Sequence, residues 1–250
     1  MTYAEISRIM FLDIETVPQR KSLDEMPEEI IHLWEEKFNA LKTYSPARFP
    51  DGTAAADAFT KNAGIYAEFG KIVCISVGFI YLKNKELHFR VKSFADDDEV
   101  KILTDFAALV NKFCVSRNHT FCRHNIKEFD IPYICRRMLV NGIPLPNALQ
   151  ISGKKPWEIT FYDTLEMWKF GDFKNFTSLK LLTAIFGIPT PKDDIDGSQV
   201  ATVYYDENNL QRISVYCQKD VVATAQVFLK INFMPMINVE NVEYVGSFSS

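Results

Sequence analysis

The sequence predicts an α/β protein with a mixed central sheet that is flanked by helices on both faces. Apolar runs typical of strands crowd the first hundred residues, at 9–12, 71–82 and 86–94. Amphipathic helical patterns then alternate with short apolar runs over the rest of the chain. Strands that come first, followed by alternation, indicate antiparallel and parallel pairing within one sheet. The composition, 47% apolar and 24% charged, is ordinary for a globular domain.

In the first half of the chain, we expect the first strand to end at the acidic pair Asp13 and Glu15. We expect a helix over 22–42, because this segment has an acidic first turn and apolar residues at helical spacing. The Pro-, Gly- and Ala-rich stretch 43–59 is expected to be a loop. The two remaining apolar runs are separated by a short polar turn, which predicts a pair of adjacent strands.

In the second half, helices and strands are expected to alternate. Ser178 is the expected N-cap of one helix and Gly187 its end. The expected elements are a helix over 98–114, a strand over 119–125, a helix from about 130, a strand over 158–165, and helices over 178–187 and 210–231.

The length of 250 residues predicts one domain, 1–250, with a helical insertion of about 20–69 after the first strand. The tail 240–250 is expected to be frayed. The insertion either caps the active site, sets the width of the substrate or mediates association. Within it, Trp34 and Phe38 either face a partner or are buried in a core.

Charge and cysteine content exclude some classes of protein. The net charge of −4 argues against a protein that coats nucleic acid, but it is compatible with an acidic site offset by divalent metals. The five dispersed cysteines form no C-x-x-C pair, so buried reduced thiols are expected rather than a zinc site. No apolar run approaches membrane-spanning length, and no signal-peptide pattern opens the chain. We therefore expect a cytoplasmic protein that binds no membrane.

Asp13 and Glu15 are two residues apart on a strand, so their side chains point to the same face. Adjacent carboxylates repel each other, and they are tolerated where a cation lies between them or where water solvates a strand end. The same triplet recurs at 97–99, so the motif alone decides nothing.

Two further acids stand out. Asp130 precedes a helix with Pro132 in its first turn, which is an ordinary N-cap arrangement. Tyr216 and Asp220 are four residues apart and share one helical face. Because apolar residues such as Val221 surround Asp220, its carboxylate must meet a cation, a donor or water.

Taken together, FLDIET, HNIKEFD and YCQKD resemble the three ordered motifs of the DEDDy 3′–5′ exonucleases. The similarity is strongest to the proofreading exonuclease domain of family B DNA polymerases and to stand-alone bacterial proteins related to it. It extends over about 8–231, with 20–69 least similar. The DEDDh branch has a His five residues before the last Asp, where this chain has Val215.

This resemblance implies a ribonuclease H-like fold in which Asp13, Glu15, Asp130 and Asp220 hold two divalent ions, Mg²⁺ or Mn²⁺. In our hypothesis, Asp13 bridges both ions and Asp130 serves the second, directly or through water. Glu15 and Asp220 complete the coordination of the ion on the side of the attacking water. Tyr216 would orient that water.

The resemblance also implies substrate-binding residues. Thr16 is expected near the terminal 3′-OH and Asn125 near the terminal nucleotide. Phe129 either stacks or packs in the core, and Asp163 either supports the metal ligands or is a strand-end acid. A further run, 169–176, interleaves Lys and Phe and is either a stacking platform for single strands or an amphipathic edge.

The expected activity is metal-dependent 3′–5′ hydrolysis of single-stranded DNA, with release of nucleoside 5′-monophosphates. The alternatives are RNA 3′-end processing and a non-catalytic nucleic-acid-binding module on the same fold. The chain has no room for polymerase domains, so the enzyme would work alone or with a separate polymerase or repair partner.

Overall fold

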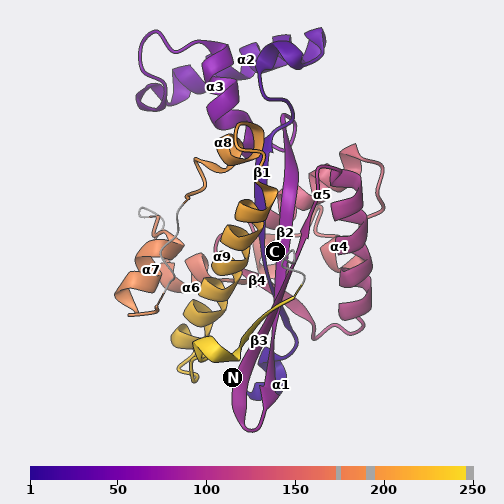
Figure 1. Cartoon of the computed structure of the whole chain (residues 1–250), viewed down its shortest axis with the longest axis vertical. Coiled ribbons are helices and arrows are strands. Elements are labelled where there is room, and N and C mark those ends of the chain that lie inside the picture. The colour runs from indigo at the N-terminus through magenta and orange to yellow at the C-terminus, as the bar shows by residue number, and fades with distance from the viewer. Residues whose placement is uncertain (173–175, 190–194, 246–250) are drawn as a thin grey trace.

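The structure, a computed structural model of the chain, describes residues 1–172, 176–189 and 195–245. Within these residues, Figure 1 shows a central six-stranded sheet in the order β5-β4-β1-β2-β3-β6, with helices on both faces. The strands are β1 (Ile9–Pro18), β2 (Gly70–Lys83), β3 (Glu86–Ala95), β4 (Thr120–Arg123), β5 (Tyr162–Asp163) and β6 (Val242–Val245). The α-helices are α1 (Tyr3–Ile6), α2 (Glu28–Tyr44), α3 (Ala55–Asn62), α4 (Glu99–Phe113), α5 (Asp130–Val140), α6 (Thr164–Lys169), α7 (Leu179–Ile185), α8 (Val200–Tyr205) and α9 (Leu210–Ile231). The predicted α/β class is confirmed.

The sheet is mixed, as predicted. β1 lies in its middle, antiparallel to β2 and parallel to β4, while β3 pairs in parallel with β6. Side chains of β1 alternate between two buried faces: Met10 and Leu12 lie on one face, and Ile9 and Phe11 on the other. Because both faces are covered, β1 reads as an almost continuous apolar run.

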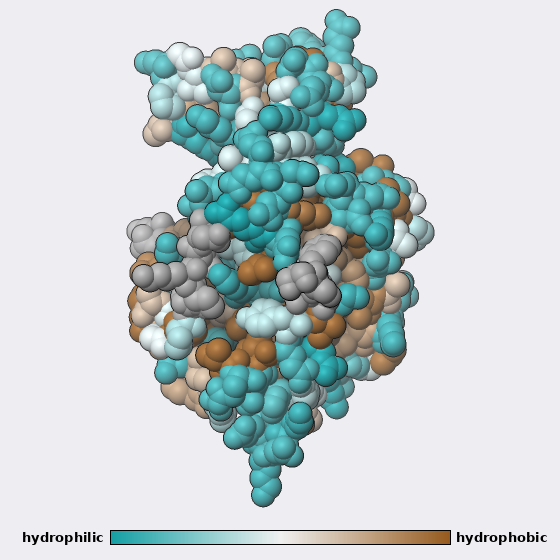
Figure 2. Space-filling view, in the orientation of Figure 1, coloured by the Kyte–Doolittle hydropathy of each residue, from teal (hydrophilic) through white to brown (hydrophobic). Residues whose placement is uncertain are grey.

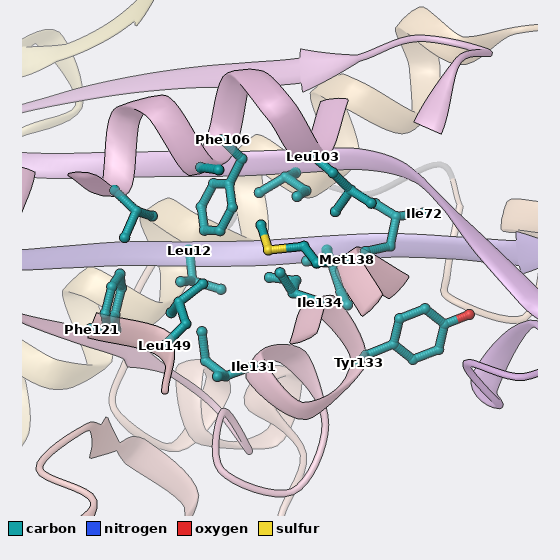
Figure 3. Packing of buried hydrophobic residues seen from close by; sticks show 14 of the residues in the cluster. Leu12, Ile72, Leu103, Phe106, Phe121, Ile131, Tyr133, Ile134, Met138 and Leu149 are labelled. Atoms are coloured by element: carbon teal, nitrogen blue, oxygen red, sulfur yellow. The ribbon is translucent and has the colours of Figure 1, made fainter. Parts of the chain in front are cut away.

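Helices α4 and α5 cover one face of the sheet. Figure 3 shows Leu103 and Phe106 of α4 and Ile134 and Met138 of α5 packed against Leu12 of β1. All five side chains are 1% exposed or less, so this face is a dry core.

Helix α9 covers the other face and packs across β1, β2 and β3. Phe11 of β1 contacts Phe89 and Phe228 edge to face, with ring centroids 5.9 and 5.6 Å apart. Helices α6, α7 and α8 pack against α9 in turn. The acids of β1 lie on this face, because they follow Phe11 by two and four residues.

The prediction that the first strand ends at the acidic pair is wrong, because β1 continues to Pro18. The element that ends there is the neighbouring strand β4, whose pairing with β1 stops at Phe11 and Cys122. Asp13 and Glu15 therefore lie just past the carboxyl end of a parallel neighbour, where open α/β sheets commonly bind ligands.

Residues 20–69 form a helical lobe that projects from the body in Figure 1 and joins it by a narrow neck in Figure 2. Trp34 of α2 is fully buried, and its Nε1 donates to the Ala55 carbonyl oxygen at 2.8 Å. The prediction of a loop over 43–59 is wrong at its end, because the Ala-rich segment starts α3 at Ala55 and Phe59 packs on Trp34. Trp34 and Phe38 are core residues of the lobe.

The tail is also more ordered than predicted. Val242–Val245 is strand β6, which pairs in parallel with β3 through Phe89 to Lys92, so the expectation of fraying over 240–245 is wrong. Glu243 anchors this strand by accepting hydrogen bonds from Arg90 and Tyr81. In the described part of the chain, no helix is long and apolar enough to cross a membrane.

Candidate active site

Strand β1 supplies two buried carboxylates to the face covered by α9. Asp13 is 0% exposed and Glu15 is 7% exposed. The register between β1 and β2 shifts between Glu15 and Thr16, which is a bulge of the kind often found beside active sites. The acids thus lie on a rigid central strand immediately before a local irregularity.

Helix α5 supplies the third acid at its first residue. The expectation that Asp130 is an ordinary N-cap is wrong: the N-cap is Phe129, and Asp130 is already helical. Asp130 is 1% exposed, and its Oδ1 has no hydrogen-bond partner among the described residues. Asp130 is therefore not the N-cap residue of α5.

Asp163 positions the loop that leads to Asp130. Its Oδ1 accepts from the Asn125 N–H at 2.9 Å, and its Oδ2 accepts from the Lys127 N–H at 3.3 Å. It also caps α6 through the Leu165 N–H at 3.0 Å. Asn125 has a left-handed φ of 74°, a turn conformation that Asn tolerates. Asp163 thus acts on the site indirectly, by holding the loop between β4 and α5.

Helix α9 contributes Tyr216 and Asp220, one helical turn apart and both half-buried. Burial, with the charges of Asp220 and Glu15, raises the pKa of the Tyr216 phenol well above its ordinary value. The hydroxyl therefore stays neutral at pH 7.

The structure brings the four acids together from β1, α5 and α9. Burial, then repulsion from Asp220 and Asp130, raises the pKa of Asp13, although Arg123 opposes the shift. Burial, then Asp13 and Asp220, raises the pKa of Glu15. Burial raises the pKa of Asp130 to about 6. Such mutually raised values are typical of a functional carboxylate cluster.

The sequence analysis missed Arg123, the last residue of β4. Its Nη2 pairs with Asp13 Oδ1, and its Nε lies 3.5 Å from Asp130 Oδ1. The carboxylates of Asp13 and Asp130 raise the pKa of Arg123 against the effect of burial. A charged residue directly after the apolar Phe121 and Cys122 of a strand was the available signal.

His124 was missed as well, and its role is structural. Its Nε2 lies 2.8 Å from the Thr177 carbonyl oxygen, and its Nδ1 lies 3.0 Å from the Thr164 hydroxyl. Burial lowers the pKa of His124 to about 4, so the ring is neutral at pH 7. It ties the end of β4 to the segment before α7.

Two cavities flank the acids. The larger, of about 770 Å³, includes Asn125, Asp130 and Phe176 in its lining, and the smaller, of about 270 Å³, includes Glu15 and Thr16. The side chains that line both cavities are Arg123, Phe129, Tyr216 and Asp220. The acidic cluster therefore lies between two spaces that a ligand can enter.

The predicted substrate-binding residues are distributed over these cavities. Thr16 lines the smaller one, Asn125 the larger one, and Phe129 both, while Phe129 also packs on Tyr133 at 5.5 Å. Phe129 thus both packs and faces the cavities. Of the 169–176 run, Phe176 lines the larger cavity, whereas residues 173–175 lie outside the described residues.

The helical lobe reaches the site through Gly64, which lies against β1. A Cβ at Gly64 would come within 3.1 Å of the Val17 backbone, and the Gly64 carbonyl accepts from the Tyr133 hydroxyl at 2.7 Å. A larger residue at this position would force the two backbones a few tenths of an ångström apart. The smaller cavity is accordingly walled on one side by the lobe residues Thr60, Lys61, Gly64 and Ile65.

The donor set of the site suits a hard divalent cation. Asp13 Oδ2 and Asp130 Oδ1 are buried without a hydrogen-bond partner among the described residues. Carboxylate oxygens of Asp13 and Glu15 and the Cys217 Sγ lie within 4.8 Å of one another. Burial raises the pKa of Cys217, and its thiol donates to the Asp13 carbonyl oxygen at 3.5 Å. Oxygen is therefore the metal-binding atom type here.

A mixed six-stranded sheet with flanking helices, and a carboxylate cluster past the end of a parallel strand, agree with a ribonuclease H-like fold. Residues 65–249 match the family described as predicted 3′-5′ exonucleases related to the exonuclease domain of PolB, and the chain belongs to this family. Asp130, Tyr216 and Asp220 lie within the matched residues, whereas Asp13 and Glu15 precede them. No curated protein matches the chain.

Proposed function

We propose that this protein is a metal-dependent 3′–5′ exonuclease that removes nucleoside 5′-monophosphates from the 3′ end of single-stranded DNA. One observation carries the proposal: four carboxylates from β1, α5 and α9 meet in one cluster, in which Asp13 Oδ2 and Asp130 Oδ1 are buried without a hydrogen-bond partner among the described residues. Burying ionised carboxylates side by side costs several kcal/mol each, of the order estimated for unpaired buried ions. A fold would not retain such a cluster for stability.

Asp13, Glu15, Asp130 and Asp220 would hold two divalent ions, Mg²⁺ or Mn²⁺. Two such ions supply an activated water, charge neutralisation at the scissile phosphate and stabilisation of the departing 3′ oxygen. Asp13 would contribute to holding both ions, since the charges of both Asp130 and Asp220 act on its carboxylate.

The other residues of the site bind and orient. The neutral Tyr216 hydroxyl would form a hydrogen bond with the attacking water and orient it, while keeping its own proton. Thr16 and Asn125 offer polar groups to the terminal nucleotide from the two cavities. Phe129, which faces both cavities, offers a ring on which a base can stack.

The lobe supports action on strand ends. Thr60, Lys61 and Ile65 line the smaller cavity together with Glu15 and Thr16, so the lobe bounds the space beside the acids. Of the three roles considered for the insertion, capping the active site agrees best with this position.

Two alternatives use the same site. RNA 3′-end processing needs the same acids and differs in contacts to the sugar 2′-hydroxyl. A non-catalytic nucleic-acid-binding module would gain nothing from mutually repelling buried acids, so the cluster favours catalysis.

The test is degradation of 5′-labelled DNA and RNA oligonucleotides of one sequence, with Mg²⁺ or Mn²⁺ and with EDTA. The wild type should shorten DNA stepwise from the 3′ end, and Asp13→Asn and Asp220→Asn should each lower the rate by about 10³-fold or more. Asp97→Asn is the matched control, since this exposed residue belongs to the other Asp-x-Glu triplet and should leave the rate unchanged.

If RNA is shortened faster than DNA, the protein is an exoribonuclease that processes RNA 3′ ends. Binding of the strands with no cleavage under either metal would refute catalysis and leave the binding module.

A further inference from the structure

Arg123 lies among the proposed metal ligands, although the proposed chemistry gives it no part. Its guanidinium pairs with Asp13 Oδ1 and approaches Asp130 Oδ1 at 3.5 Å, and its side chain is 15% exposed. Guanidinium groups and hard divalent ions both bind carboxylate oxygens. Two kinds of cation therefore share the same two carboxylates.

The pairing of Arg123 is incomplete. Its Nε has no hydrogen-bond partner among the described residues, and the same is true of Asp13 Oδ2 and Asp130 Oδ1. By contrast, Arg137 donates from Nε, Nη1 and Nη2 to Glu99 and to the Ala67 carbonyl oxygen. A buried arginine that only holds the fold together is expected to be satisfied in the way that Arg137 is.

Arg123 also has space to move. It lines both cavities, and the larger one measures about 770 Å³. Phosphate is the other common partner of a guanidinium, which can bind it with two parallel hydrogen bonds. A nucleic-acid strand in the larger cavity would bring phosphates to this side chain.

We propose that Arg123 competes with divalent metal for Asp13 and Asp130, and that it moves to a substrate phosphate when the metal takes these carboxylates. The inference rests on the proposed function. It makes the binding of metal and strand cooperative, because the phosphate offers the displaced guanidinium a new partner. Metal affinity is then low until a strand is bound.

The first experiment measures Mn²⁺ binding by calorimetry in wild type, Arg123→Gln, Arg123→Lys and the control Arg90→Gln, which removes a surface arginine. We expect Arg123→Gln to bind Mn²⁺ about tenfold more tightly, since a competing charge is gone. Arg123→Lys keeps the charge, but one ammonium group cannot pair with both carboxylates. The Mn²⁺ affinity of Arg123→Lys should therefore lie between those of wild type and Arg123→Gln. Arg90→Gln should match wild type.

Unchanged or weaker Mn²⁺ binding by Arg123→Gln would overturn the competition, because it would show that Arg123 holds the carboxylates ready for metal. Wild-type affinity in Arg123→Lys beside tighter binding in Arg123→Gln would also overturn it, because net charge alone would then explain the change. If Arg123→Gln does not fold, ¹⁵N spectra of wild type replace it: the Arg123 Nε signal, assigned with Arg123→Lys, should shift on saturation with Mg²⁺. A signal that stays in place would overturn the proposal.

The second experiment repeats the Mn²⁺ titration with a phosphorothioate-linked single-stranded oligonucleotide. The strand should tighten Mn²⁺ binding several-fold in wild type and less than about twofold in Arg123→Gln. Equal tightening in both would overturn the transfer of Arg123 to phosphate.

Asp13→Asn separates the two levels of proposal. If wild type binds no Mn²⁺, or Asp13→Asn binds it equally well, the metal centre and the proposed function fail together. If wild type binds Mn²⁺ through Asp13 while Arg123→Gln binds no more tightly, only the competition fails.

Discussion

Two Asp-x-Glu triplets in this chain, at 13–15 and 97–99, place their carboxylates in opposite situations. Glu99 is buried, and its carboxylate accepts from the Arg137 guanidinium, from the Ile72 N–H at 2.7 Å and from Asn141 at 3.0 Å. Asp97 is exposed and accepts from the Tyr204 hydroxyl at 2.7 Å. This second triplet joins α4 to β2 and α5.

The first triplet is only partly satisfied, because Asp13 Oδ1 accepts from the Ile14 N–H at 2.9 Å and pairs with Arg123. Asp13 Oδ2 lacks a hydrogen-bond partner among the described residues, and the surroundings of Glu15 raise its pKa by burial and by the charges of Asp13 and Asp220. The two triplets thus differ in how far their buried carboxylates are compensated, and removing a partner from a buried charge is costly. The second triplet links elements of the fold, whereas the first supplies the acids of the proposed site.

The largest effect expected from this comparison is on catalysis. Glu15→Gln keeps the shape but removes a negative charge from the cluster, so kcat should fall by about 10³-fold. Because the pKa of Glu15 is raised by burial and repulsion, the variant should unfold at the same or a higher temperature in EDTA. Oligonucleotide degradation and thermal melting measure the two quantities. A variant with wild-type kcat would place Glu15 outside the reaction.

The next effect concerns stability. Arg137→Met leaves Glu99 buried without its cation, which should lower the free energy of unfolding by about 3–5 kcal/mol. Denaturant titration measures it, with Arg90→Met as a control on the exposed pair with Glu243, where the loss should be much smaller. The double variant Glu99→Leu/Arg137→Met should recover most of the loss. Equal losses for Arg137→Met and Arg90→Met would remove the distinction between the two triplets.

The smallest expected effect is on pH dependence. Burial raises the pKa of Asp130 from 3.8 to about 6, so metal must displace a proton below that pH. Through this carboxyl, Mn²⁺ affinity should fall by about tenfold for each pH unit below 6. Without metal, in EDTA, the stability of the fold changes with pH in the opposite direction. The folded protein keeps this proton to a higher pH than the unfolded chain, so the free energy of unfolding falls as pH rises from about 4 to 6.

Calorimetry between pH 5 and 7.5 measures the affinity, and Asp130→Asn should lose the step near pH 6. An unchanged step in Asp130→Asn would assign it to another member of the cluster.

Local patterns predicted much of the fold. The helix expected over 210–231 is α9 with the same ends, and Ser178 caps α7 through the Leu181 N–H as expected. The paired strands around the turn at 83–85 are also confirmed. These elements were predictable because hydrophobic period and caps act between residues close in sequence.

The failures share a different origin. The strand over 158–165 shrinks to Tyr162–Asp163, and Val242–Val245 becomes a strand only because β3 offers a parallel edge. β1 continues past its acids because β2 pairs with it as far as Pro18. Pairing between segments far apart in the chain decided each case, and no local pattern records it.

For the site, residue types and spacing were enough to select Asp13, Glu15, Asp130 and Asp220, and the structure brings these four together. The same reasoning treated Asp130 alone as a helix cap and passed over Arg123. The cap was misassigned because the helix begins one residue earlier than a cap requires. Arg123 was missed because its partners are acids more than a hundred residues away or across a loop.

What the sequence by itself determined was the set of carboxylates and the class of fold, because both depend on residue type and periodicity. What only the tertiary structure decided was which of those carboxylates are paired. Glu99 of α4 is paired with Arg137 of α5, whereas Asp13 lies beside an incompletely hydrogen-bonded Arg123 and three other acids. The physical reason is that the free energy of a buried charge depends on the groups around it in space, and those neighbours come from distant parts of the chain.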